Sequence, residues 1–509
     1  MTALQARFLV FVANAAVLML EILAGRLLAP IVGVTLQTFT GIIGVVLAGI
    51  AIGAWCGGQL ADRHDPRRML PMVFALGGAT AIGAVPMIRI FGSAGLGGGP
   101  AAIVFLTAVS FFLPSAVLSA APPMVVKLRL GSTAETGSVV GSLSATGTAG
   151  SLCGVFVTGF VLIGHVPTTP IVIGTGAVLV AIGAALHLRD RPADRPDGRD
   201  GDAQRIASCA VFALAAASLA VAIPGQCDKE TAYFCARVIV DPHRSSGRLL
   251  MLDDQRHSYI DLVDPLHLEF SYAQVVGDVI DVVAPPNEPI DVVHIGGGGF
   301  SLARYIRATR PGSRSEVFEL DPGLVSLAER ELGLVLGDDI EVRTGDARVN
   351  IRTRGAASAD LVIGDAFGGE AVPWHLTTVE FLRAVQHVMR PGAVYVLNLI
   401  DRPPLAFVRA EVATLRATFA HVAVLAPINR LDGLEGGNFE VIASDGELPV
   451  EALRAANTAR TGSPSRTEAG ATVDVTVLDD AAGLDRFVGD ARVLTDEFAP
   501  VDQLITTRR

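Results

Sequence analysis

A glycine-rich turn followed by an acidic residue is the feature of this chain that most directly suggests chemistry. Four consecutive glycines, Gly296–Gly299, end an apolar run and stand directly before a helix-compatible stretch. Gly296, Gly297 and Gly298 would let the backbone approach a nucleotide-bearing ligand at a helix N-terminus without Cβ clashes. Glu319 ends the next apolar run, roughly twenty residues on, where an acid that binds ribose hydroxyls belongs. The pattern predicts a nucleoside-binding site.

Two further acids stand at the ends of apolar runs. Asp346 follows the run Ile340–Thr344, and Asp365 follows the run Asp360–Gly364. Because ligands of open α/β sheets bind at the carboxyl ends of the strands, we expect Glu319, Asp346 and Asp365 to meet in one crevice. Each acid taken alone could serve only as a helix cap. Together, behind the glycine turn, they favour a binding site.

The elements that position these residues alternate between strand and helix patterns. Predicted strands cover residues 291–295, 316–320, 340–344, 360–364, 394–400, 421–425 and 438–443. Helical patterns at Thr378–Met389 and Phe407–Phe419 fit βαβ crossovers, so we expect a mostly parallel sheet in a Rossmann-like α/β domain over residues 291–509. Ahead of it, strand patterns at 236–241, 248–253 and 257–263 and a helix near 266–283 predict a small β-hairpin subdomain with a connecting helix over residues 225–290.

Residues 1–224 contain seven apolar segments. They lie near 8–23, 39–60, 70–88, 101–121, 139–163, 170–186 and 206–223, and each is about the length needed to cross roughly 30 Å of hydrocarbon. We therefore predict an α-helical transmembrane bundle of about seven helices in the plasma membrane, with the lipid bilayer as a partner. The pairs Gly137/Gly141 and Gly150/Gly154 have the spacing that lets helices approach closely, and a substrate path is the alternative interpretation.

Loop charges predict how this bundle is oriented. Ten cations follow the second, fourth and sixth segments: Arg63, Arg67, Arg68, Lys127, Arg129, Arg189, Arg191, Arg195, Arg199 and Arg205. The alternate loops carry only Arg26 and Arg89, so the C-terminal half is expected outside the cytoplasm. Cys227 and Cys235 could pair in such an oxidising compartment, and the alternative is two free thiols in a cytoplasmic linker. An extracytoplasmic domain conflicts with the cytoplasmic origin of nucleoside ligands.

Charge and composition exclude other classes of protein. The net charge of −11 offers no broad basic face, so we expect no nucleic-acid partner. Half of the residues are hydrophobic and the mean hydropathy is +0.48, which agrees with a lipid-embedded half. His257, His294 and His375 lack the spacing of metal ligands, so no metal site is expected. The sequence leaves open whether the chain forms a homodimer.

The C-terminal half resembles the spermidine synthase family, the polyamine aminopropyltransferases, which share the fold of methyltransferases that use S-adenosylmethionine. The resemblance runs from about Arg248 to the end. It is carried by Leu252–Gln255, Tyr272, the glycine turn, Glu319–Pro322, Gly345–Ala347, Asp365 and Leu494–Pro500. With the apolar helices in front, the chain is similar to bacterial membrane proteins in which such a domain follows a transporter-like region. The loop Asp62–Arg68 resembles one in major-facilitator transporters, but seven segments are too few for that fold.

The resemblance implies a role for each matching residue. Gly296–Gly298 would line a sulfonium nucleoside, Glu319 would hold its ribose hydroxyls, and Asp346 would lie beside the adenine. Asp365 would face an amine acceptor and accept its proton, while Tyr272 would help to position that amine. The co-substrate would be decarboxylated S-adenosylmethionine or S-adenosylmethionine, with no tightly bound cofactor.

Three departures from the family pattern lie on the acceptor side. Gly299 and Gly368 stand where family members have acids, and Gln274 stands where the family has Glu. Because an unpaired buried ammonium is costly, these losses argue against a dicationic acceptor. The leading hypothesis is aminopropyl transfer to a polyamine. The alternatives are methyl transfer to another, perhaps lipid-linked, acceptor, and a transporter or sensor that binds polyamine or nucleoside without turnover.

Overall fold

The computed structural model describes residues 1–509 except 95–98, 131–135, 190–199, 370, 462–473 and 506–509. The chain forms two compact units. One comprises Met1–Arg237 with Leu252–Gln255, and the other comprises Val238–Met251 with Arg256–Arg509. The boundary falls inside strand β2 (Cys235–Val240), so the segment predicted as a small β subdomain is shared between the two units.

The first unit is a helical bundle. Its helices are α1 (Ala3–Val32), α2 (Leu36–Arg63), α3 (Pro66–Gly92), α4 (Pro100–Thr107), α5 (Leu113–Ser119), α6 (Ala121–Arg129), α7 (Thr136–Val157), α8 (Ile163–His165), α9 (Thr168–Arg189) and α10 (Asp200–Ala222). Short π-helical stretches join α4 to α5 and α7 to α8. Among the described residues, seven helical spans are long and apolar enough to cross a membrane. Arg191, Arg195 and Arg199, which contributed to the predicted orientation, lie outside the described residues.

Small residues bring α1 and α7 into close contact. A Cβ on Gly150 would lie 2.3 Å from the carbonyl oxygen of Phe11, and one on Gly154 would lie 2.5 Å from that of Ala15. Such contacts leave no room for a side chain, so this pair packs helices as its spacing predicts. The other pair has no such contact in the described part of the chain, where a Cβ on Gly137 or Gly141 would meet nothing within 4 Å.

The segment after α10 is fastened to the ends of the helices of its own unit. Arg26 donates to the carbonyl oxygens of Thr231 and Tyr233 at 2.6 Å each. The backbone amide of Thr168, at the start of α9, donates to both carboxylate oxygens of Glu230 at 3.0 Å. A disulfide joins Cys227 to Cys235, so the alternative interpretation, two free thiols, is wrong.

Two sheets are present in the described part of the chain. The smaller has the order β1 (Lys229–Glu230), β2, β3 (Gly247–Leu252), β4 (Gln255–Asp261). The larger has the order β12-β10-β11-β9-β8-β5-β6-β7. Its strands are β5 (Asp291–Ile295), β6 (Arg314–Glu319), β7 (Ile340–Thr344), β8 (Ala359–Gly364), β9 (Met389–Asp401), β10 (His421–Ala426), β11 (Gly437–Ser444) and β12 (Thr476–Leu478). The pairs among β5 to β9 are parallel, but β9–β11, β10–β11 and β10–β12 are antiparallel. The Rossmann-like core is as predicted, whereas the expectation of a mostly parallel sheet fails at this edge.

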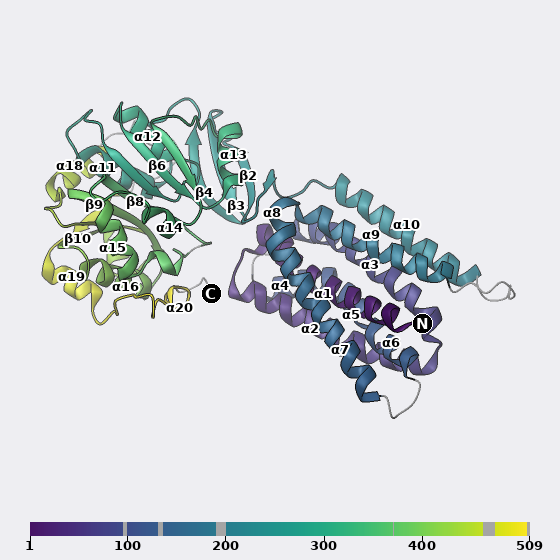
Figure 1. The fold of residues 1–509 in the computed structure, drawn as a ribbon. Helices are drawn as coiled ribbons and strands as arrows, with labels where there is room; N and C mark the ends of the chain where they lie inside the picture. The colour runs from purple at the N-terminus through teal and green to yellow at the C-terminus, as the bar shows by residue number, and fades with distance from the viewer. Residues whose placement is uncertain (95–98, 131–135, 190–199, 370, 462–473, 506–509) are drawn as a thin grey trace. The chain divides into compact units, whose positions relative to one another are not determined.

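Helices cover both faces of the larger sheet (Figure 1). One face packs against α15 (Val379–Val388), α16 (Ala406–Arg416) and α19 (Ala481–Val488), and the opposite face packs against α11 (Ser271–Val282), α12 (Ser301–Thr309) and α18 (Val450–Thr461). The remaining helices of this unit are α13 (Pro322–Glu331), α14 (Ala347–Ile351), α17 (Ile428–Leu431) and α20 (Val501–Leu504). Burial alternates along β9: Leu397 belongs to the first core and Val396 to the second. This period of two decides which side chains of a strand share a face.

Candidate functional site

The register of the parallel strands brings the predicted residues to one edge of the sheet. Ile295 pairs with Phe318 on β6 and with Gly364 on β8. The next residues along the three strands are therefore Gly296, Glu319 and Asp365. This edge is the carboxyl end of the parallel strands, where ligands of open α/β sheets bind.

The glycine turn connects β5 to α12 and needs glycine for steric reasons. Gly296 has φ +97° and Gly298 has φ +51°, values that residues with a side chain rarely adopt. A Cβ on Gly296 would lie 2.4 Å from the carbonyl oxygen of Asp365. The turn thus presses against the start of the loop that follows β8.

Glu319 holds the glycine turn in place. Its carboxylate accepts hydrogen bonds from the backbone amides of Gly297 (2.9 Å), Gly298 (3.4 Å) and Asp321 (2.9 Å). The side chain is buried, and burial raises the pKa of Glu319 although these amides oppose the shift. Because a carboxylate has about four lone-pair sites, three amides leave capacity for a further donor. The family resemblance did not indicate that Glu319 holds the glycine turn.

Asp346 lies at the same edge of the sheet but serves as a helix cap. It follows β7, accepts from the backbone amide of Arg348 at 2.7 Å, and so begins α14. The ring of His375 lies 3.1 Å from its other carboxylate oxygen. The adjacent amide of Gly345 donates to the carbonyl oxygen of Glu319 at 2.9 Å, which ties the two strand ends together. A role of Asp346 beside an adenine stays a prediction.

Asp365 belongs to a chain of hydrogen bonds that crosses three elements. The hydroxyl of Tyr272, on α11, donates to Asp365 at 3.1 Å. Asn398 donates to its other oxygen at 2.8 Å, and Asn438 donates to Asn398 at 2.9 Å. Burial raises the pKa of Asp365 to about 6, while the two hydrogen bonds oppose the shift. A carboxyl group with such a pKa can take up and release a proton near neutral pH.

The wall opposite the glycine turn is strand β4. Ser258 accepts a hydrogen bond from the backbone amide of Gly299 at 3.0 Å. A Cβ on Gly299 would lie 2.2 Å from the Ile260 side chain and 2.9 Å from Cβ of Ser258. The closeness of β4 therefore excludes the acid that family members carry at this position. At Gly368, the other departure, a Cβ would meet, among the described residues, only the carbonyl oxygen of Ala371 at 4.0 Å, so none of these residues excludes a side chain there.

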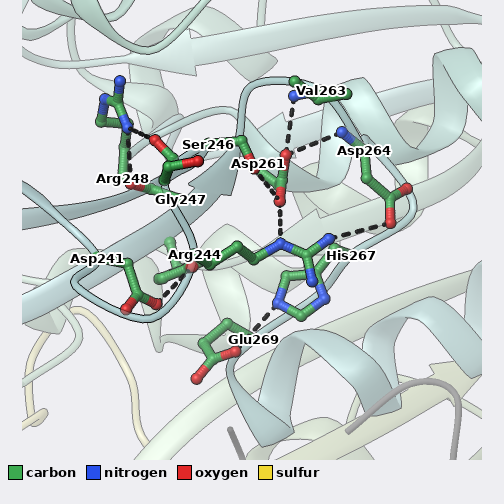
Figure 2. A network of polar contacts seen from close by, with 12 residues as sticks. Asp241, Arg244, Ser246, Gly247, Arg248, Asp261, Val263, Asp264, His267 and Glu269 are labelled. Atoms are coloured by element: carbon green, nitrogen blue, oxygen red, sulfur yellow. Dashed lines mark hydrogen bonds and ion pairs between the residues drawn. The ribbon is translucent and has the colours of Figure 1, made fainter. Parts of the chain in front are cut away.

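A polar network fixes the end of β4 (Figure 2). Asp261 accepts from the backbone amides of Val263 (2.8 Å) and Asp264 (2.9 Å) and forms an ion pair with Arg244. Ser246 also donates to Asp261, at 3.0 Å. Although burial opposes ionisation, these contacts lower the pKa of Asp261 to about 2. The charged network thus ties the end of β4 to Arg244 and Ser246, ahead of β3, and to the loop that follows β4.

Three polar residues of this site were missed by the sequence analysis. Asn398 on β9, together with Asn438 and Glu440 on β11, lies inside a buried strand, with 3% of Asn398 and 2% of Glu440 exposed. The available signal was one polar residue within the apolar run of β9 and two near the start of β11, because buried polar residues need partners inside the protein.

Comparisons with known proteins find similarity to polyamine aminopropyltransferases. A polyamine aminopropyltransferase of Vibrio vulnificus is 34% identical over 134 residues, which are 26% of this chain and 44% of that relative. One of Chromobacterium violaceum is 28% identical over 181 residues, or 33% of this chain and 67% of that relative. This chain is related to the polyamine aminopropyltransferases. The predicted resemblance to this transferase family is thereby confirmed.

The related proteins also include methyltransferases. The eEF1A lysine and N-terminal methyltransferase of Danio rerio is 27% identical over 132 residues, which are 24% of this chain and 19% of that relative. A probable spermidine synthase of Corynebacterium glutamicum, known from a crystal structure, is 28% identical with a TM-score of 0.48, covering 53% of this chain and 95% of that chain. No protein-family model matches. This chain spans less than half of the length of the Vibrio relative.

Proposed function

We propose that the chain is a membrane-bound transferase that moves an aminopropyl group from a sulfonium nucleoside, nominally decarboxylated S-adenosylmethionine, to an amine acceptor. The observation that carries the proposal is the common edge of Glu319 and Asp365 beside the glycine turn. Glu319 would bind the ribose of the donor, Gly296–Gly298 would line it, and Asp346 would lie near its base. Similarity to polyamine aminopropyltransferases supports the choice of the transferred group.

In this reaction the lone pair of the acceptor amine attacks the sulfonium-bound carbon of the aminopropyl group. The bond between that carbon and sulfur breaks, its electron pair goes to sulfur, and a neutral thioether nucleoside leaves. The amine loses one proton to the Asp365 carboxylate, whose pKa of about 6 suits a base at neutral pH. Tyr272 would position the amine through its hydrogen bond to Asp365.

The test is product analysis with the purified full chain. Two preparations of sulfonium donor are used, one labelled in the aminopropyl group and one labelled in the methyl group. Aminopropyl transfer places only the first label on the acceptor and leaves the second label on the thioether nucleoside. Transfer of neither label, with donor binding retained, would refute a transferase and support a binding protein.

Methyl transfer from S-adenosylmethionine is the second candidate. It is favoured by the similarity to eEF1A lysine and N-terminal methyltransferases and by the glycines at 299 and 368, where the family carries acids. In that reaction the acceptor attacks the methyl carbon and the demethylated thioether leaves. Recovery of the methyl label on the acceptor would replace the first candidate with this one.

We also propose that the helical unit spans the plasma membrane and that the C-terminal half faces away from the cytoplasm. Seven long apolar helices, the distribution of loop cations and the disulfide between Cys227 and Cys235 support this orientation. A domain on that side would have to receive a donor made inside the cell, so its side is worth testing directly.

A further inference from the structure

We infer that Glu440 is a specificity-determining residue of the acceptor site, whose carboxylate pairs with the far ammonium group of a diamine. This inference rests on the transferase proposed above and narrows its acceptor to a dication. Nothing in the sequence motifs pointed to Glu440, because it lies inside strand β11 and not at the end of a parallel strand.

Strand register places Glu440 in the same row as Asp365. Gly364 pairs with Leu397, so the next residues, Asp365 and Asn398, are neighbours, and Asn398 in turn pairs with Glu440. The hydrogen bond from Asn398 to Asp365 shows that these two side chains lie on one face. Strand alternation puts Glu440 on that face too, since Ile442, two residues on, packs in the core that contains α11.

The spacing of this row fits a short diamine. Neighbouring strands lie about 4.8 Å apart, so the backbone positions of Asp365 and Glu440 are separated by roughly 10 Å. Both side chains extend from the same face, so the two carboxyl groups can contact one ligand that lies along this face. An amine held at Asp365 would therefore direct the rest of its carbon chain past Asn398 towards Glu440.

Glu440 is buried without an adequate partner. Only 2% of the residue is exposed, and one carboxylate oxygen, Oε1, has no hydrogen-bond partner among the described residues. A buried oxygen without a partner is costly, so its retention calls for an explanation. An ammonium group from a ligand would supply the missing donor. The Glu440 carboxyl group, on another strand, would thereby take over the task of the acids that are absent at Gly299 and Gly368.

Burial and the charges around Glu440 determine whether its carboxyl group carries a proton before such a ligand binds. Burial raises the pKa of Glu440 to about 8, Arg430 and Arg460 oppose the shift, and Asp365 adds to it. The nearby phenol of Tyr272 stays protonated, because burial and the two carboxyl groups raise its pKa. Arg460 is itself engaged with Asp278 at 2.8 Å, and Arg430 donates to the carbonyl oxygen of Asn438 at 3.0 Å. At neutral pH the empty site thus holds a proton on Glu440, which a bound ammonium group would displace.

The experiment compares the full chain with the Glu440→Gln variant, using diaminobutane and butylamine as probes in the presence of the thioether nucleoside. Calorimetry should show that diaminobutane binds at least about tenfold more weakly to the variant, while butylamine binding changes less than about twofold. Glu411→Gln is the matched control, since Glu411 is also buried and has carboxylate oxygens without a hydrogen-bond partner among the described residues, but lies on α16, against the other face of the sheet. This control should bind both amines like the parent.

A second measurement separates charge pairing from a merely structural role. Repeating the titration at pH 7 in buffers of different ionisation enthalpy should show release of most of one proton when diaminobutane binds to the parent, and none in the Glu440→Gln variant. Equal diaminobutane affinity in variant and parent, or equal weakening of both amines, would overturn the inference. Loss of nucleoside binding in the parent itself would instead count against the proposed transferase.

Discussion

Replacing Glu319 by alanine should weaken nucleoside binding for two separable reasons. The side chain accepts the backbone amides of Gly297 and Asp321, both at 2.9 Å, and thereby holds the glycine turn. In the proposed complex it also accepts the ribose hydroxyls of the donor. Glu319→Ala removes both tasks at once, so a loss of affinity alone would not show which one matters.

The magnitude can be worked from the number of groups left without an acceptor. Each buried donor that loses its acceptor costs about 1–3 kcal/mol, which corresponds to roughly fivefold to 150-fold in affinity. Because three backbone amides leave Glu319 about one lone-pair site, the two ribose hydroxyls together account for about one such loss. Loosening of the turn adds a further loss that is the same for any nucleoside, with or without hydroxyl groups.

A double-mutant cycle separates the two contributions. Calorimetry measures the affinity of the parent and of Glu319→Ala for the adenosyl sulfonium donor and for its analogue without ribose hydroxyls. If Glu319 binds the ribose, removing the hydroxyls weakens the parent by about fivefold or more but leaves the variant nearly unchanged. Equal weakening of both proteins by the analogue would refute ribose binding and leave only the holding of the turn. Glu316→Ala is the control, because Glu316 lies on the same strand in an ion pair with Arg343.

Four further outcomes are expected. Asp365→Asn should lower turnover by about 10²–10⁴ with nucleoside affinity unchanged. In the parent, kcat/KM should rise as the Asp365 carboxyl group ionises around pH 6, and the variant should lack this rise. Equal turnover would remove Asp365 from the mechanism. Burial raises the pKa of Glu411, so the folded chain keeps a proton that the unfolded chain loses, and stability falls above about pH 4.5 by up to about 1.4 kcal/mol per pH unit. Glu411→Gln should flatten this fall between pH 5 and pH 8 in thermal unfolding, and an unchanged slope would contradict it. Gly368→Asp should leave the melting temperature within about 2 °C, whereas Gly299→Asp should lower it by several degrees, and the reverse order would refute the steric argument. A cysteine at exposed Glu451, in a chain without its free cysteines, should react with an impermeant reagent in intact cells, and labelling only after permeabilisation would place the domain inside.

Much of the fold follows from sequence pattern because the strands are short apolar runs with sharp ends. The predicted strand at 291–295 coincides with β5, and the predicted helix Thr378–Met389 differs from α15 by one residue at each end. The antiparallel pairing at the edge of the sheet was not predicted, although the length of one connection indicates it. The connection between β10 and β11 contains only the four-residue helix Ile428–Leu431, too short for the crossover that parallel strands need.

Only some residues of the candidate site could be predicted from the sequence pattern. The glycine turn, Glu319 and Asp365 could be predicted because a single topological rule places strand ends at one edge. Tyr272 came only from the family resemblance, since a tyrosine on a helix has no distinctive spacing. Asn398 could not be assigned to the site from the sequence. Its position beside Asp365 depends on the register between β9 and β8, which the sequence pattern does not give.

The two glycines that replace family acids therefore have different physical meanings. At Gly299, strand β4 occupies the space that a side chain would need, so the loss of the acid follows from how closely this wall packs against the turn. At Gly368 the described residues leave space for a side chain, so their packing does not account for the loss. The carboxyl group of Glu440 stands in the row of Asp365, and its Oε1 has no hydrogen-bond partner in the part of the chain that the structure describes. Gly299 and Gly368 remove acids only at positions that the family uses, whereas Glu440 lies on another strand. Once Glu440 is included, the site again offers two carboxyl groups to two ammonium groups, one at each end of a diamine.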